Sequence, residues 1–292
     1  MKVTSALPFV FALAAAPCFA QTTTLPQKNA AVAGLLDRAT GYVNTYVHAF
    51  SRVVAEEHYV QDSHPMPRVD GVALPGGREM QTAQHADLRS DLLFVRTAPS
   101  DDWLTFRDVF SVNGHPVRDR AERLSKLLTG PSSDTIDRAA EIAREGYRYN
   151  VGSKDRTVAS PLLAMAFLQP AYRDRFEFRI SGIDTSVGPD VWILKFQEKK
   201  GPSTILRTSE NRNVMSKGRF WIDGATGRVL QTELETSVQD RVMTVFTFDE
   251  RLGLDVPAEM RDIAWQDGTV VTGTATYANF RRFEVTTDEK VR

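Results

Sequence analysis

The chain has almost no cysteine. It carries a single one among 292 residues, Cys18, and this residue falls in an N-terminal segment that we expect to be removed. The mature chain would then have none, which excludes disulfide bonds and thiol chemistry. A fold of this composition must rest on its hydrophobic core alone.

Long hydrophobic runs are missing after the first twenty residues. No later run approaches the roughly 20 apolar residues that a membrane-spanning helix needs, so we expect no transmembrane segment in the mature chain. Residues 1–20 themselves are typical of a signal peptide, with Lys2 before an apolar core and with Cys18 and Ala20 at the −3 and −1 positions. We expect cleavage after Ala20 and a periplasmic or secreted protein.

Neither sign of charge is in excess. The chain has 36 Lys and Arg residues against 37 Asp and Glu residues. A basic excess of the kind that drives non-specific binding to phosphate backbones is absent, so we expect no nucleic-acid partner.

Catalytic and metal-binding motifs are missing as well. The five histidines include no H-E-x-x-H pair on one helix face, and there is no G-x-S-x-G nucleophile elbow. The neighbouring carboxylates Glu56 and Glu57 would point to opposite faces of a strand and would not share a site. We interpret them as solvated strand charges, and we expect no enzymatic activity, no metal and no cofactor.

The clearest pattern that is present runs from Tyr172 to Glu284. It reads as six successive strands joined by short turns, centred on the hairpin turn at residues 223–227, where glycines supply the positive φ that such a turn needs. Alternating apolar residues are typical of antiparallel strands with one buried face. In the last strand Tyr277 is predicted to face away from Phe280, and Arg281 and Arg282 are expected at a solvated rim or in salt bridges.

The first half of the chain mixes helices and strands. Helical periodicity predicts an amphipathic helix over residues 30–49, and strands are predicted over 50–62, 88–97 and 103–113. The prolines and glycines of residues 65–77 predict a surface loop. A helical insertion is expected over 118–168, with helices at 118–128 and 136–149 and a short buried helix or plug at 161–168. We interpret residues 21–292 as one domain.

These elements together predict an α+β fold, a curled antiparallel β-sheet that forms an incomplete β-barrel of about 9–11 strands covered by a few α-helices. Such a sheet encloses an apolar space, which side chains fill in small barrels and a ligand occupies in larger ones. Seven aromatic residues at alternating strand positions could face this space, either as core or as the lining of a ligand cavity: Phe106, Phe178, Trp192, Phe196, Phe220, Phe246 and Tyr277.

The whole pattern resembles the LolA/LolB-like lipoprotein-sorting superfamily. It shares a signal peptide, an early amphipathic helix and a long antiparallel sheet whose later strands run through G-R-F-W-I-D-G-A-T-G-R-V-L and A-T-Y-A-N-F-R-R-F. It is also similar to exported bacterial proteins of unknown function with this ending. The resemblance implies an incomplete barrel with a helical lid and an apolar cavity that binds a lipid or an acylated lipoprotein.

A second hypothesis comes from a different class of function. The insertion at 118–168 and the loop at 65–77 are large for that superfamily, and either could fill the cavity. The protein would then be an envelope scaffold with a filled interior and no ligand. It would bind a protein partner through the loop and the edges of its sheet.

Overall fold

The computed structural model describes residues 25–51, 53–65, 83–96, 103–117, 141–152, 158–208, 211–266 and 268–282. The predicted signal peptide, residues 66–77 of the predicted loop and the predicted helix at 118–128 lie outside these residues. The elements of the first half are α1 (Leu25–Phe50), β1 (Val53–Pro65), β2 (Gln84–Arg96), β3 (Trp103–Val112), β4 (His115–Pro116), the 3-10 helix η1 (Leu163–Leu168) and α4 (Pro170–Arg173).

Strands make up most of the second half of the chain. They are β5 (Phe176–Ile183), β6 (Val191–Glu198), β7 (Leu206–Arg207), β8 (Asn213–Val214), β9 (Ser216–Asp223), β10 (Val229–Thr236), β11 (Arg241–Asp249), β12 (Leu254–Gln266) and β13 (Thr269–Arg282). The sequence predicted six strands between Tyr172 and Glu284. The structure places seven of its strands in the main sheet, and β7 and β8 form a separate two-stranded sheet.

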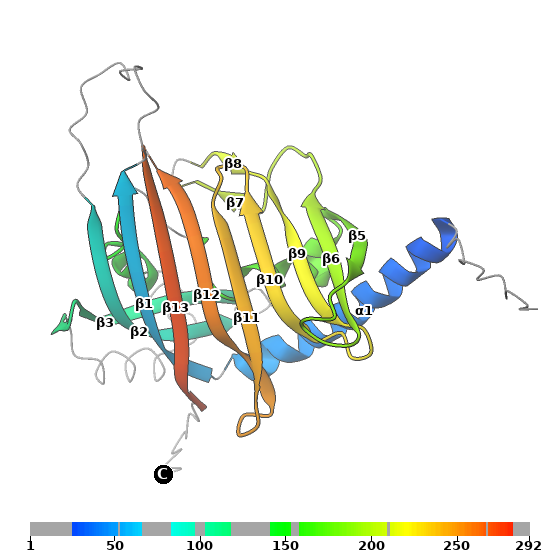
Figure 1. Cartoon of the computed structure of the whole chain (residues 1–292), viewed down its shortest axis with the longest axis horizontal. Helices are drawn as coiled ribbons and strands as arrows, with labels where there is room; N and C mark the ends of the chain where they lie inside the picture. Colours follow the sequence, from blue (N-terminus) through cyan, green and yellow to red (C-terminus); the bar gives the residue numbers. More distant parts are fainter. Residues whose placement is uncertain are drawn as a thin grey trace, which may run out of the picture.

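A large antiparallel sheet organises the described part of the chain (Figure 1). Its eleven strands follow the order β4-β3-β2-β1-β13-β12-β11-β10-β9-β6-β5, and the sheet does not close, since β4 and β5 are its two ends. The predicted fold class, an open antiparallel sheet with a few helices, is confirmed. The predicted early helix is α1, and the predicted plug at 161–168 is η1, whose side chains are mostly buried.

The first and last strands lie side by side in the middle of this sheet. The pairing of β1 with β13 runs from Val53 opposite Arg282 to Pro65 opposite Thr269, with a β-bulge where residues 278–281 pass Val54 and Glu56. Within the bulge Asn279 has φ of 51°. The extra residue shifts the alternation, so Tyr277 and Phe280 both join the buried core, and the prediction that they face opposite ways was wrong.

Helix α1 covers one face of the sheet, which we call the inner face (Figure 1). The helix residues in contact with the core recur every three or four positions, as an amphipathic helix requires, and hydrogen bonds add to this apolar packing. The Tyr42 hydroxyl donates to Asp255 Oδ2 at 2.8 Å, and the Arg228 guanidinium donates to both oxygens of the same carboxylate at 2.9 and 2.5 Å. Thr40 Oγ1 donates to the Leu168 carbonyl of η1 at 2.9 Å. The buried apolar residues of α1 are Leu35, Ala39, Val43, Tyr46, Val47 and Phe50.

The opposite face, which we call the outer face, is covered near β1, β2 and β3 by a second helix. Residues 141–147 are helical, within the predicted helix at 136–149. Ile142 and Ala143 pack on Val54 and Leu93 in a small separate core. No helix in the described residues is both long enough and apolar enough to cross a membrane.

Candidate functional site

The structure places six of the seven predicted aromatic residues together. They belong to the main core or pack against it, whereas Phe106 lies on the outer face in the separate core beside helix 141–147. Phe106 pairs with Leu93, and its neighbour Arg107 pairs with Leu92, whose side chain is part of the main core. Because β3 has large side chains on both of its faces, its sequence did not show which face is turned inward. The six residues of the inner group are Phe178, Trp192, Phe196, Phe220, Phe246 and Tyr277.

Phenylalanine rings fill the inner face at the end formed by β5, β6 and β9, which we call the aromatic end. Phe196 stacks on Phe220 with ring centroids 4.7 Å apart and meets Phe176 edge-on at 5.5 Å. From η1, Phe167 stacks on Phe176 at 4.7 Å. All four rings are buried. The 3-10 helix therefore acts as the plug that the sequence predicted, and the aromatic end is packed core.

Charged and polar side chains occupy the inner face where β1, β2, β3 and β13 meet, which we call the polar end. The Arg107 guanidinium forms an ion pair with Glu57, whose side chain is 0 % exposed. The same Glu57 oxygen, Oε2, accepts a hydrogen bond from Ser90 Oγ at 2.8 Å. Arg107 also donates to the carbonyl of Ala159 at 2.7 Å and lies over the Tyr59 ring, 4.4 Å from its centroid.

Burial and neighbouring charges decide which groups of this cluster are ionised. Burial acts to lower the pKa of the Arg107 guanidinium, but the charge of Glu57 and the nearby tyrosines outweigh it, so this pKa is raised. Burial, followed by the charge of Glu57, raises the pKa of the Tyr277 hydroxyl well above its usual value. Around neutral pH, Arg107 is therefore a cation and Tyr277 is neutral.

Two buried oxygen atoms at the polar end have no hydrogen-bond partner among the described residues. Glu57 Oε1 and Thr105 Oγ1 have no partner within the part of the chain that the structure describes, and the same holds for Thr244 Oγ1 in the middle of the inner face. Leaving such an atom unpaired costs about 1–3 kcal/mol. A small cavity of about 20 Å³ touches Thr105, Arg107 and Ala159, which is room for about one water molecule. The polar end can thus accept a hydrogen bond from a water molecule or from a bound polar group.

This cluster was not predicted from the sequence. Glu56 and Glu57 do point to opposite faces as predicted, since Glu56 accepts a hydrogen bond from Asn279 at 2.8 Å while Glu57 is buried inside. The prediction that Glu57 is a solvated strand charge was wrong. A usable signal was present, because Glu57 shares its alternation with Ala55 and Tyr59, and residues of one alternation face the same side.

Two of the histidines lie beside carboxylates on the sheet. His58 contacts Asp87 at 3.0 Å and His85 contacts Asp62 at 2.8 Å. In the described ranges no group of three or more His, Cys, Asp or Glu side chains is arranged to hold a metal ion.

The solved structures similar to this chain include a family protein of undefined function and a domain named for lipoprotein sorting. No protein-family model matches the sequence, and no curated protein matches it. A DUF1329 family protein from Desulfovibrio piger is 11 % identical, with a TM-score of 0.38, over 88 % of this chain and 95 % of that one. A domain from Vibrio parahaemolyticus named for outer membrane lipoprotein sorting is also 11 % identical, with a TM-score of 0.38, over 86 % of this chain and 95 % of the other.

Proposed function

We propose that this protein is an exported, non-catalytic binding protein that holds a lipid or the acyl chain of a lipoprotein between the inner face of the sheet and its helices. The observation that carries the proposal is the unpartnered Glu57 Oε1, a buried acceptor on a face that is otherwise largely apolar. A ligand that suits such a surface is itself amphipathic. It would combine a hydrocarbon chain with a polar group that donates hydrogen bonds.

The free energies of apolar burial and of hydrogen bonding together favour a lipid over a purely apolar or a purely polar molecule. Each buried methylene contributes about 0.8 kcal/mol, so a single acyl chain binds usefully without any specific polar contact. A hydroxyl or ammonium group of the ligand that donates to Glu57 Oε1 would remove the cost of an unpaired buried oxygen. In this proposal the polar group of the ligand sits at the polar end. Its chain then runs over β13, β12 and β11, because phenylalanine rings fill the aromatic end.

Native mass spectrometry tests the proposal. The chain is purified without detergent from a host that exports it and is measured before and after extraction with organic solvent. We expect extra mass of lipid size that disappears on extraction. A bare polypeptide mass that takes up neither added fatty acid nor added phospholipid would overturn the proposal.

A matched pair of substitutions on β13 tests whether any bound lipid lies on the inner face. Ala275 is fully buried on the inner face next to Tyr59, whereas its neighbour Thr274 is exposed. Ala275→Phe should remove the lipid mass because the ring occupies inner space, and Thr274→Phe should retain it. Near-ultraviolet circular dichroism checks that both variants are folded. Equal lipid content in the two folded variants would rule out the inner face as the binding surface.

The packed aromatic end favours a second candidate, the envelope scaffold with a filled interior. If the packing of Phe167 against Phe176 and Phe196 is typical of the whole inner face, the protein carries no ligand and contacts a protein partner instead. Deleting residues 65–77 separates the two hypotheses. The scaffold hypothesis expects a partner to be lost from a pull-down, and the lipid hypothesis expects unchanged lipid content.

A further inference from the structure

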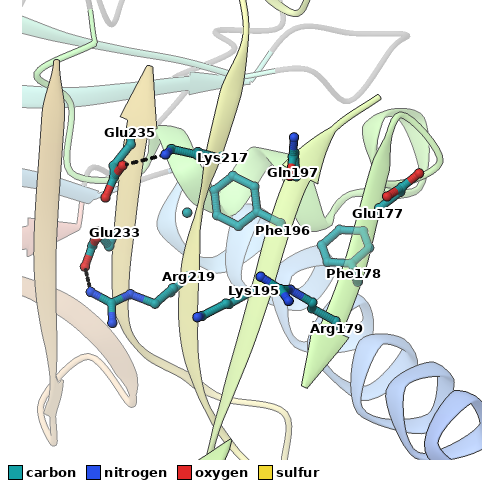
Figure 2. A pocket seen from close by; sticks show the side chains of 11 residues that line it. Glu177, Phe178, Arg179, Lys195, Phe196, Gln197, Lys217, Arg219, Glu233 and Glu235 are labelled. Atoms are coloured by element: carbon teal, nitrogen blue, oxygen red, sulfur yellow. Dashed lines mark hydrogen bonds and ion pairs between the residues drawn. The ribbon is translucent and has the colours of Figure 1, made fainter. Parts of the chain in front are cut away.

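A trough of about 380 Å³ crosses the outer face of β5, β6, β9 and β10 (Figure 2). Two rows of side chains form its walls, each row running straight across the strands. The first row is Arg179, Lys195, Arg219 and Glu233, and the second is Glu177, Gln197, Lys217 and Glu235.

The trough stays open because of the residues between its two walls. Phe178, Phe196 and Gly218 form the middle row, and the alternation of a strand turns this row toward the inner face. Phe178 and Phe196 accordingly pack in or against the main core. The two walls are two residues apart along each strand, a separation of about 7 Å. That width admits one small charged group.

Three cations stand directly opposite one another in the first row. Arg179 pairs in register with Lys195, and Lys195 pairs with Arg219. Side chains in such positions have Cβ atoms about 5 Å apart, and like charges placed there are destabilising. The arrangement therefore favours any anion that binds between these residues.

The nearby carboxylates are already held by other cations. Glu233 is paired with Arg219, and Glu235 lies 3.2 Å from Lys217 and 3.1 Å from Arg241. Burial acts to raise the pKa of Glu235, but Lys217, a hydrogen bond with Glu233 and the charge of Arg241 outweigh it, so this pKa is lowered. Glu235 is thus an anion already engaged by two cations.

Arg179 and Lys195 lack such partners. Neither makes a salt bridge or a side-chain hydrogen bond that involves the described residues, and Glu177 is the remaining carboxylate of the trough. The trough contains four cationic side chains and three carboxylates. Two of these carboxylates are engaged, which leaves Arg179 and Lys195 as the free cationic pair.

We propose that this trough binds a phosphate group, with Arg179 and Lys195 as the principal contacts and Arg219 beside Lys195 in the same row. A guanidinium donates a planar pair of hydrogen bonds to phosphate oxygens, and an ammonium adds a compact charge beside it. The phosphate belongs either to a free small molecule or to a lipid head group. The site lies on the face of the sheet opposite the proposed lipid site and does not rest on that proposal.

Two binding measurements on the full exported chain distinguish the sources of phosphate. Isothermal titration with inorganic phosphate and with glycerol 3-phosphate tests the free group, and flotation with phosphatidylglycerol vesicles against phosphatidylcholine vesicles tests the head group. The variant Arg179→Gln/Lys195→Gln should bind its phosphate source at least about tenfold more weakly than the unaltered chain. Its melting temperature should rise, because the substitutions remove repulsion between like charges.

The control removes the same charge from elsewhere on the surface. Arg89 and Lys200 are exposed and lie outside the trough, so Arg89→Gln/Lys200→Gln should leave phosphate binding unchanged. Binding of the free phosphates alone assigns the site to a soluble ligand, and binding of the anionic vesicles alone assigns it to a head group. The proposal is overturned if neither source binds, or if the control weakens binding as much as the trough variant does.

Discussion

The aromatic end and the polar end bury different kinds of side chains on the inner face. At the aromatic end, Phe167, Phe176, Phe196 and Phe220 exclude water by ring packing. At the polar end, Glu57 and Arg107 are buried as a pair of opposite charges. Burial of apolar rings does not depend on pH, whereas a buried ion pair depends on both partners being present and charged.

This difference assigns separate roles to the two ends. A buried ion pair contributes little net stability because each charge loses its hydration, yet losing one partner is costly since the other is left unpaired. Apolar burial such as the ring packing of the aromatic end therefore contributes more stability than the ion pair does. In the proposed function, the unpartnered oxygen of Glu57 at the polar end is the group that a ligand donates to.

Breaking the ion pair should give the largest effect. Arg107→Met leaves the Glu57 carboxylate buried without its cation, and we expect a loss of about 3–5 kcal/mol in the free energy of unfolding. Urea denaturation followed by circular dichroism measures it. The double variant Glu57→Gln/Arg107→Met removes both charges and should recover more than half of the loss. If the double variant is no more stable than Arg107→Met, the cost comes from lost packing of the long side chain rather than from the unpaired charge.

Gly218 offers a sharp test of the aromatic end. A Cβ atom at this position would lie 1.9 Å from the Glu233 carbonyl oxygen and 2.7 Å from the Phe196 ring. Gly218→Ala should therefore lower the free energy of unfolding by about 1–3 kcal/mol, as overpacked cores do. The matched control is Gly41→Ala in α1, where nothing lies within 4 Å of the added atom. That substitution should stabilise the helix by up to about 1 kcal/mol, and comparable losses at both glycines would contradict the packing argument.

The sequence predicted the architecture because alternation and periodicity are local properties. The helix at 30–49, the plug at 161–168 and the strands after Tyr172 all follow from spacing within a few residues. The pairing of β1 with β13 could not be predicted in this way, since it joins residues more than 200 positions apart. The bulge at Asn279 reversed the expected facing of Phe280 for the same reason, because the extra residue is defined only by the partner strand.

The candidate sites depended on information that a single strand does not contain. In β3 the set Phe106 and Phe110 competed with the set Trp103 and Val109, and only the register with β2 shows that Arg107 faces inward with the second set. The cationic row of the trough likewise emerges from register, since Arg179, Lys195 and Arg219 stand on three strands. The pairing between strands, which the sequence of a single strand does not show, was needed to predict both sites.

Alkaline pH should lower the free energy of unfolding, because buried tyrosines resist ionisation in the folded chain. Burial raises the pKa of Tyr277 and of Tyr46 well above the usual value of about 10. Above pH 10 the unfolded chain therefore loses protons that the folded chain retains, so stability is fully present below pH 10 and falls as the pH rises further. Each such tyrosine contributes about 1.4 kcal/mol per pH unit.

Urea titrations between pH 8 and pH 11.5 measure this slope. Tyr277→Phe removes one titrating hydroxyl from the polar end, and the slope above pH 10 should become shallower by the share of one tyrosine. Phe178→Leu at the aromatic end removes no titrating group and should shift the whole curve without changing its slope. An unchanged slope in Tyr277→Phe would show that this hydroxyl ionises as readily in the folded chain as in the unfolded one.

The smallest expected effect lies between the two ends, at Thr244. Its hydroxyl oxygen is buried and has no hydrogen-bond partner in the described residues, and the residue pairs with Met260 and Thr232 on neighbouring strands. Thr244→Val replaces the hydroxyl by a methyl group of similar size, so the free energy of unfolding should stay unchanged or rise by up to about 1 kcal/mol. Denaturation of protein stripped of lipid measures this value. A fall of 1 kcal/mol or more would mean that the hydroxyl is paired with internal water, and that the polar end extends along the inner face as far as β11.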